Sequence, residues 1–353
     1  MDYIQDLINI TRLGASDIFI IAGKEITYKA YSQIESYNDQ TLSPAMTREF
    51  IEAIYENAHR DIHILLDEGD DDFSFSIANI SRFRVSTYKQ RGSLAAVIRV
   101  IAFELPNASS LHIPESIIKM GQINKGLVLV TGPAGSGKTT TLACIIDYIN
   151  QNYQKHIITL EDPIEFLHSH KKSIVSQREI HIDTQSYVKA LRASLRQSPD
   201  VILLGEMRDY ETTNVAITAA ETGHIVFSTL HTIGAAKTID RIIDVFPPNQ
   251  QRQIAVQLSL TLHAVISQQL VPTIDGTMIP VFEVMYMNPA IRNVIRDNKT
   301  HQIDGIIASS SNENMISMDT SLFTLYKQGI ILDKTAIQFA SNPEMMTKKL
   351  QNI

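Results

Sequence analysis

The sequence of 353 residues has no tryptophan and a single cysteine, Cys144. One thiol excludes an internal disulfide and any zinc site built on two or more thiolates. No apolar run approaches the roughly 18 residues that a membrane-spanning helix needs. The first ten residues carry Asp2 and Asp6 without a basic cluster, which argues against a secretory signal. These absences predict a protein of the cytoplasm, in which Cys144 is a small buried residue.

Basic residues are also few. Lys and Arg number 31 against 38 Asp and Glu, so the formal net charge is −7 and the sequence pI is about 5.9. Proteins that bind duplex DNA usually carry a basic surface, because neutralising phosphates drives their affinity. The overall balance therefore disfavours nucleic acid as a partner, although it leaves a local basic stripe open.

The length favours two domains. Over residues 1–100, apolar residues at helical spacing (7–13 and 46–59) accompany short or alternating apolar runs (17–22, 73–77 and 83–85), which predicts a small α+β domain. The acidic run at 68–72 is expected to be a solvated turn. Residues 101–114 contain two prolines and the polar patch Asn-Ala-Ser-Ser, which predicts a linker.

Beyond the linker, helical segments alternate with the apolar runs LVLVTG, HIITLE, DVILLGE and HIVFSTL. Strands that are apolar throughout are typical of a sheet buried on both faces, so residues 115–271 predict a mostly parallel sheet with helices on each side. Residues 272–353 are expected to be a mainly helical extension. The predicted fold class is α/β, with a small α+β domain before the main sheet and a helical tail after it.

The segment Gly132–Thr139 (GPAGSGKT) fits the phosphate-binding pattern G-x-x-x-x-G-K-[ST] between a predicted strand and a predicted helix. Backbone N–H groups of such a turn and the positive end of the helix bind phosphate oxygens. Lys138 is expected to reach the β- and γ-phosphates, and the Thr139 hydroxyl to ligate Mg²⁺. The alternative is an ordinary glycine-rich turn. The predicted nucleotide-binding residues here are Gly132, Pro133, Ala134, Gly135, Ser136, Gly137, Lys138, Thr139 and Thr140.

Carboxylates follow two of the predicted strands. Glu165 lies in LEDPIE, where it can hold the water that attacks the γ-phosphate; the alternative is a solvated acidic turn. Glu206 ends DVILLGE, where it can hold Mg²⁺ or its waters; the alternative is an ordinary strand-end glutamate. His224 and His231 bracket a further strand, and His231, at the carboxyl end, is the better candidate for a γ-phosphate sensor.

Taken in order, GPAGSGKT, LEDPIEF, LLGEMRD and TGHIVFSTLHT resemble the Walker A, Asp box, Walker B and His box of secretion ATPases, which drive type IV pilus, type II secretion and conjugation-type machines. Within that superfamily the chain most resembles the PilT-type pilus retraction ATPases. The similarity extends through Gln177–Asp200, Ala235–Pro248 and Ala290–Ile303, of which the last is the most diagnostic.

The resemblance implies a RecA-like ATPase core behind a PAS-like N-terminal domain, with ATP and Mg²⁺ as ligands. It makes Glu165 the general base, Glu206 the Walker B carboxylate, and His224 and His231 the His box pair. It also implies a homohexameric ring in which the N-terminal domain of one subunit packs on the ATPase domain of the next.

Two arginines of that N-terminal domain, Arg84 and Arg99, match residues that reach a bound triphosphate in the family. An arginine near the γ-phosphate stabilises the charge of the transition state. The alternative for both is a surface ion pair on a strand. The segment between them departs from the family pattern, with Arg91 and Gly92 in a different phase.

Pilus-assembly relatives usually have an additional N-terminal domain and a four-cysteine zinc motif, and this sequence has neither. The leading hypothesis is therefore an ATPase that powers pilus retraction and twitching motility through an inner-membrane platform protein. It would act at the inner face of the cell membrane, in contact with the membrane only through that protein. The alternatives are a motor for a secretion or conjugation machine, a nucleic-acid translocase, and a non-catalytic nucleotide-gated scaffold.

Overall fold

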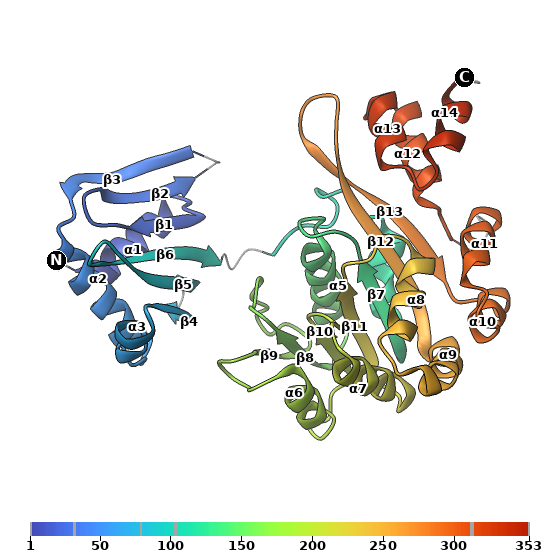
Figure 1. The fold of residues 1–353 in the computed structure, drawn as a ribbon, viewed down its shortest axis with the longest axis horizontal. Helices are drawn as coiled ribbons and strands as arrows, with labels where there is room; N and C mark the ends of the chain where they lie inside the picture. The colour runs from blue at the N-terminus through green and yellow to red at the C-terminus, as the bar shows by residue number, and fades with distance from the viewer. Residues whose placement is uncertain (1, 31–32, 78–79, 102–104, 311–313, 352–353) are drawn as a thin grey trace. The chain divides into compact units, whose positions relative to one another are not determined.

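The computed structural model describes residues 2–30, 33–77, 80–101, 105–310 and 314–351, and it divides into two units near residue 104. The first unit holds a six-stranded antiparallel sheet in the order β3-β2-β1-β6-β5-β4 (Figure 1). Its strands are β1 (Asp17–Ile20), β2 (Glu25–Ala30), β3 (Gln33–Thr41), β4 (Asp70–Ile77), β5 (Ser81–Gln90) and β6 (Ser93–Ile101). Its helices are α1 (Tyr3–Arg12), α2 (Pro44–Asn57) and α3 (His63–Glu68). The predicted α+β character is confirmed.

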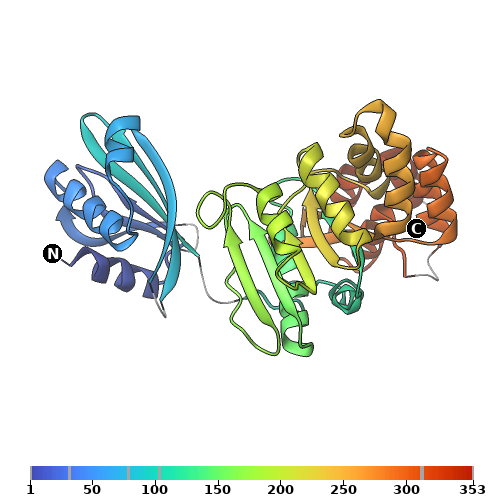
Figure 2. The ribbon, with the colours of Figure 1, turned by 90° about the horizontal axis from the view of Figure 1, so that it is seen from below.

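Helix α2 lies against the sheet, where it contacts β6 (Figure 2). It begins at Ser43, whose hydroxyl accepts a hydrogen bond from the backbone N–H of Met46, and Pro44 occupies its first turn. Phe50 and Ile54 are fully buried on its inner side. The helices and one face of the sheet therefore enclose the core of this unit.

The acidic run at 68–72 is only partly the solvated turn that was expected: Glu68, Asp70 and Asp72 are exposed, but Asp71 is buried in a strand. Strand β4 begins at Asp70, so every second side chain after it faces the helices, and Asp71 is only 9% exposed. Both carboxylate oxygens of Asp71 accept hydrogen bonds from the Arg60 guanidinium, at 2.7 and 2.6 Å. The Tyr55 hydroxyl donates a further bond to Asp71, at 2.8 Å.

The second unit is built on a seven-stranded sheet in the order β13-β12-β7-β11-β10-β8-β9. All neighbouring strands run parallel except β12 and β13. The strands are β7 (Gly126–Thr131), β8 (His156–Glu161), β9 (Ile174–Glu179), β10 (Val201–Leu204), β11 (Ile225–Leu230), β12 (Leu262–Pro272) and β13 (Met278–Tyr286). Every residue of β7, β10 and β11 is buried, which confirms the mostly parallel sheet expected from the apolar runs.

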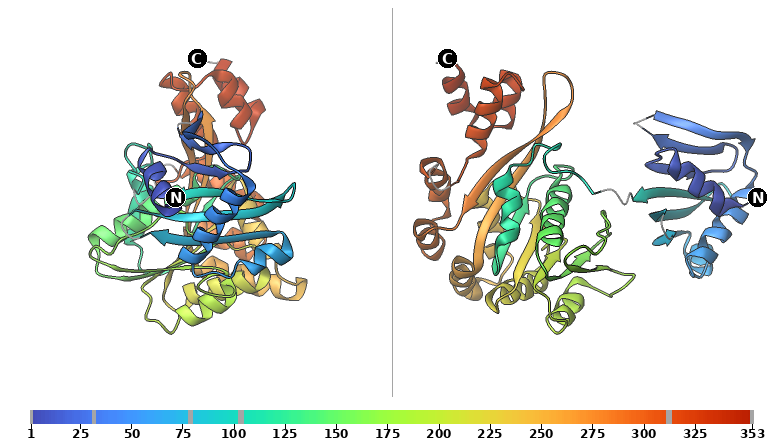
Figure 3. Two further views of the ribbon diagram at one scale, coloured as in Figure 1. Left: turned by 90° about the vertical axis from the view of Figure 1, so that its left-hand side faces the viewer. Right: turned by 180° about the vertical axis from the view of Figure 1, so that it is seen from behind.

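Helices cover both faces of this sheet (Figures 1 and 3). Alternate residues of β7 divide between two cores: Leu127 and Leu129 pack towards α6 to α9, and Val128 and Val130 pack towards α4 and α5. The helices of the second unit that precede β12 in the chain are α4 (Glu115–Ile118), α5 (Lys138–Asn152), α6 (Tyr187–Ser194), α7 (Tyr210–Glu221), α8 (Ala235–Asp244) and α9 (Pro248–Thr261), with the 3-10 helix η1 (Lys119–Gln122). Among the described residues, no helix is both long and apolar enough to span a membrane.

The predicted linker at 101–114 includes residues 102–104, which lie outside the described residues. Its last part belongs to the second unit, where Ile113 packs into the core beside α5.

The tail after Pro272 is mainly helical as predicted, but it begins with strand β13, which the sequence analysis did not identify. Pro280 lies within this strand and interrupts its apolar run. Proline is tolerated there because β13 is an edge strand, in which every second N–H group points away from β12 and is not needed for pairing within the sheet. The tail helices are α10 (Pro289–Arg296), α11 (Ile303–Ser309), α12 (Met318–Lys327), α13 (Asp333–Phe339) and α14 (Pro343–Gln351), with the 3-10 helix η2 (Thr300–Gln302).

Candidate functional site

The parallel strands bring the predicted site segments to one edge of the sheet. Thr131 at the end of β7 pairs with Leu230 at the end of β11, and Leu204 at the end of β10 pairs with Leu160 of β8. The glycine-rich turn, His231, Glu206 and the acidic loop after β8 all follow these strand ends. In open α/β sheets this carboxyl edge is where ligands bind.

The glycine-rich turn lies between β7 and α5, as the sequence predicted. Gly132, Gly135 and Gly137 all have positive φ angles, of 143°, 74° and 86°. Gly132 also lies against β12, because a Cβ atom at this position would be 2.1 Å from the backbone oxygen of Gln268. Both the conformation and the packing of the turn therefore require glycine at position 132.

Several polar groups of the turn face inward. The Lys138 ammonium donates hydrogen bonds to the carbonyl oxygens of Gly132 and Pro133, both at 2.9 Å. The hydroxyls of Thr131 and Ser136 are buried without a hydrogen-bond partner in the described part of the chain. Buried hydroxyls are normally bonded, so these two are suited to a ligand that carries acceptor oxygens. The amino end of the 15-residue helix α5 adds a positive potential at the same place.

Glu206 and His231 lie together at this edge. The side chain of Glu206 is 13% exposed; its Oε2 atom accepts a hydrogen bond from Nε of Arg208 and lies 3.5 Å from Nε2 of His231. Arg208 was not among the predicted site residues, although it follows Glu206 by two positions in LLGEMRD. Glu165 lies in the loop that follows β8, with its side chain exposed.

A half-buried tyrosine that the sequence did not reveal, Tyr187, lies beside the carboxylates. The Tyr187 hydroxyl is 2.7 Å from where a Cβ atom on Gly205 would stand. Burial raises the pKa of Tyr187, and the negative charges of Asp162, Glu206 and Glu161 raise it further. The phenol is therefore neutral at physiological pH and able to donate a hydrogen bond.

The structure places His224 away from this edge. It precedes β11, whereas His231 follows it, and six strand residues separate the two ends by about 20 Å. Nδ1 of His224 lies 3.1 Å from the carbonyl oxygen of Ala219, within its own turn. The structure therefore does not bring His224 to the glycine-rich turn of the same chain.

Arg84 and Arg99 lie on neighbouring strands of the first unit and are direct cross-strand partners. Nε of Arg99 is 3.2 Å from Oδ1 of Asp17, so Arg99 takes part in the surface ion pair that was considered as an alternative. Arg91 and Gly92, which departed from the family pattern, form the tight turn between β5 and β6 with φ angles of 48° and 80°.

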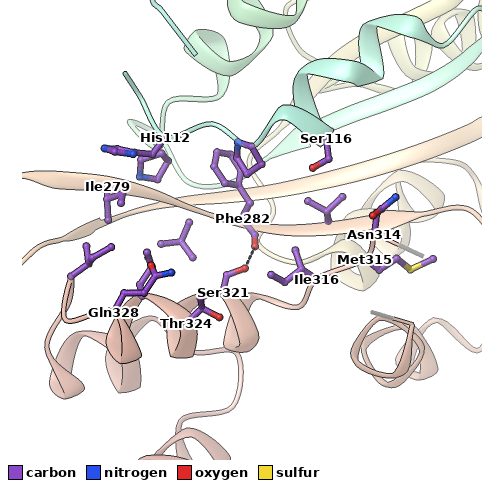
Figure 4. Close-up of a pocket in the computed structure, with 16 residues that line it drawn as sticks. His112, Ser116, Ile279, Phe282, Asn314, Met315, Ile316, Ser321, Thr324 and Gln328 are labelled. Atoms are coloured by element: carbon purple, nitrogen blue, oxygen red, sulfur yellow. Dashed lines mark hydrogen bonds between the residues drawn. The ribbon is translucent and has the colours of Figure 1, made fainter. Parts of the chain in front are cut away.

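A cavity of about 280 Å³ adjoins the glycine-rich turn. Its walls include Gly137, Thr140, Thr141, Gln268 and the segment 110–113. A larger cavity of about 530 Å³ lies between β13 and α12, where Ser321 donates a hydrogen bond to the carbonyl oxygen of Phe282 (Figure 4). Because the larger cavity does not include the glycine-rich turn and the smaller one does, the smaller one is the candidate site.

Known proteins resemble this chain over most of its length. The family described as "Type II/IV secretion system protein" matches residues 3–305. The "Type IV pilus retractation ATPase PilT" of Pseudomonas aeruginosa is 41% identical over 345 residues, which cover 98% of this chain and 99% of that protein. A "Twitching motility protein" of Neisseria gonorrhoeae is 49% identical over 277 residues, which cover 78% of this chain and 74% of that protein.

Two solved structures share the fold. A structure of "the Pilus Retraction Motor PilT and Bound ADP" superposes with a TM-score of 0.88 and 44% identity, over 99% of each chain. The ATPase DotB of Legionella pneumophila gives a TM-score of 0.80 and 29% identity, over 94% of this chain and 93% of that one. These similarities confirm the α/β fold class with its antiparallel N-terminal sheet and helical tail.

Proposed function

The chain belongs to the type II/IV secretion system protein family as a PilT-like ATPase, and we propose that it hydrolyses ATP to power the retraction of type IV pili, and hence twitching motility. The observation that carries this proposal is the glycine-rich turn with its inward-facing lysine and unpartnered hydroxyls, in a chain similar over its whole length to a retraction ATPase.

ATP would bind with its phosphates in the glycine-rich turn, residues 132–137. The backbone N–H groups and the amino end of α5 would hold the phosphate oxygens, and Lys138 would turn from the carbonyls of Gly132 and Pro133 to the β- and γ-phosphates. The cavity beside Thr140 and Thr141 lies next to these residues and is available for the rest of the nucleotide.

The oxygen donors at the sheet edge fit a Mg²⁺ ion. The Thr139 hydroxyl and the Glu206 carboxylate would hold it, the latter partly through water, and Mg²⁺ supplies neutralisation of phosphate charge. No group of three or more His, Cys, Asp or Glu able to hold a metal is found among the described residues. Mg²⁺ is usually held by one or two protein ligands together with phosphates and water.

For hydrolysis, Glu165 would accept a proton from the attacking water as the new bond to the γ-phosphorus forms and the bond to ADP breaks. His231 would hydrogen-bond the γ-phosphate or this water from its place beside Glu206. His224 is proposed as the other member of the His box, with no direct contact to the nucleotide bound by the same chain.

The working assembly is proposed to be a homohexamer in the cytoplasm, at the inner face of the cell membrane, acting on a platform protein of that membrane. Arg84 and Arg99 would approach the nucleotide of a neighbouring subunit and stabilise the transition-state charge. No nucleic acid is expected as a partner, since the net charge of −7 disfavours it.

A second candidate is the ATPase of a related secretion or conjugation machine, because the family that matches residues 3–305 is described as "Type II/IV secretion system protein". Retraction is the leading proposal, because the structure of the pilus retraction motor is 44% identical to this chain over 99% of its length. Deleting the gene separates the two: loss of twitching with normal secretion supports retraction, and the reverse supports the alternative.

The enzymatic part is tested by measuring Mg-dependent ATPase activity against protein concentration, together with mass in solution. Shared sites predict that specific activity falls as the assembly dissociates, and a flat profile would contradict them. Lys138→Ala should abolish activity, whereas Lys155→Ala, which changes a lysine bonded to Asn124, should not. A Glu165→Gln variant with near-normal turnover would exclude Glu165 as the base.

A further inference from the structure

Strand β12 carries three consecutive buried polar residues, Ser267, Gln268 and Gln269, which are 0%, 2% and 8% exposed. Each binds the backbone of a different segment. The Ser267 hydroxyl accepts a hydrogen bond from Gly234 at the start of α8, and the Gln269 amide donates one to Phe339 in the tail. Because successive side chains leave a strand on opposite faces, Gln268 alone points to the α5 side.

The Gln268 amide joins the glycine-rich turn to the first turn of α5. Its Nε2 donates to the carbonyl oxygen of Ser136 at 2.7 Å, and its Oε1 accepts from the Thr141 hydroxyl, also at 2.7 Å. The carbonyl of Ser136 can only accept, so it fixes which end of the amide faces it. These bonds hold both sides of Lys138, since Ser136 precedes it by two residues and Thr141 follows it by three.

The turn also packs directly on Gln268. A Cβ atom on Gly137 would be 2.9 Å from Nε2 of Gln268, and one on Gly132 would be 2.1 Å from its backbone oxygen. Gln268 therefore contacts both ends of the turn, while Gly135 at its tip has no atom within 4 Å of a Cβ position. A turn held at its two ends has little freedom to rearrange at the tip.

We propose that Gln268 is a positioning residue that holds the glycine-rich turn in its phosphate-binding conformation. The inference rests on the proposed ATPase function and extends it to a residue 130 positions along the chain from Lys138. Without the amide, the turn keeps its N–H groups but loses the bonds that direct them, so nucleotide affinity should fall about tenfold.

The test compares Gln268→Met with Gln269→Met in the full-length protein. Both changes keep the side-chain volume and remove a buried amide from the same strand, but only the first amide contacts the turn. Binding of ADP with Mg²⁺, measured by calorimetry, should weaken about tenfold in Gln268→Met and stay unchanged in Gln269→Met. KM for ATP should rise similarly with a smaller change in kcat, because binding to ground and transition states is lost alike.

Thr141 supplies a second route if Gln268→Met does not fold. Thr141→Val removes the hydroxyl that donates to Gln268 and should weaken ADP binding, whereas Thr141→Ser keeps the hydroxyl and should bind as the wild type. In a double-mutant cycle, the variant that carries both Gln268→Met and Thr141→Val should lose less ADP affinity than the sum of the two single losses, because both changes break the same hydrogen bond.

The outcomes distinguish the proposed ATPase function from the positioning role of Gln268. Wild-type protein that binds no ADP would refute the proposed function. If the wild type binds ADP and Gln268→Met binds it equally well, the positioning role is refuted and the ATPase proposal stands. Equal weakening in Gln268→Met and Gln269→Met would assign the effect to strand β12 in general and would also refute the positioning role.

Discussion

Replacing glycines of the turn one at a time separates two reasons for their presence. In Gly132→Ala the new Cβ would be 2.1 Å from the backbone oxygen of Gln268, so the turn and β12 must move apart by about 1 Å. The φ angle of 143° adds strain for any residue with a Cβ. In Gly135→Ala the φ angle of 74° adds strain alone, because no atom lies within 4 Å of the new Cβ.

The two changes should differ strongly in effect. A displacement of about 1 Å at a phosphate site can lower kcat/KM about 100-fold. The left-handed conformation costs an alanine about 1 kcal/mol, which corresponds to about fivefold. We therefore expect kcat/KM for ATP to fall about 100-fold in Gly132→Ala and about fivefold in Gly135→Ala.

The assay is steady-state hydrolysis of ATP with Mg²⁺, with thermal unfolding measured on the same samples to establish that both variants are folded. Equal losses of kcat/KM in the two variants would refute the steric argument, because only the Cβ of Gly132→Ala would collide with β12. A Gly132→Ala variant with wild-type activity would show that β12 can move away from the new Cβ without any loss of catalysis.

Three further predictions concern stability and reactivity. Burial lowers the pKa of His168 to about 4, so the unfolded chain takes up a proton at this residue before the folded chain does. The free energy of unfolding should therefore fall by about 2 kcal/mol from pH 7 to pH 5. Urea unfolding of His168→Gln should lack this part of the pH dependence, and an unchanged dependence would contradict the prediction. Burial raises the pKa of the Cys144 thiol to about 11, so a disulfide reagent at pH 8 should label it far more slowly in the folded protein than in urea, and equal rates would show that it is exposed. Asp71→Asn should lower the free energy of unfolding by about 2 kcal/mol, because it weakens the bonds between the buried Asp71 carboxylate and the partly exposed Arg60 guanidinium. Asp72→Asn, at an exposed neighbouring position, should have little effect, and similar losses in the two variants would argue against the pair.

Much of the site follows from local sequence. The turn Gly132–Thr139 is contiguous, and its pattern and flanks predict strand, turn and helix together. The ends of parallel strands share one sheet edge, so strand predictions alone suffice to bring Glu206 and His231 to the same edge. The same reasoning places His224 and His231 at opposite edges of the sheet, because they flank the two ends of one strand, β11.

Other features depend on contacts that local patterns do not encode. Gln268 reaches the turn only because β12 pairs with β7, a partner more than 130 residues earlier in the chain. The spacing of Arg84 and Arg99 gave no sign that the hairpin register would place them opposite each other. Asp71 was expected to be solvated by composition, and the phase of β4 buries it.

The alternation of contacts along β12 bears on how the protein can be altered. Adding one residue within this strand ahead of Ser267 would turn every later side chain to the opposite face, and would disturb the start of α8, the phosphate turn and the tail at once. The turn that joins β12 to β13 is different, because Ile274, Asp275 and Gly276 are exposed. A fluorophore or epitope tag belongs at that turn, where the chain can lengthen without shifting the register of either strand.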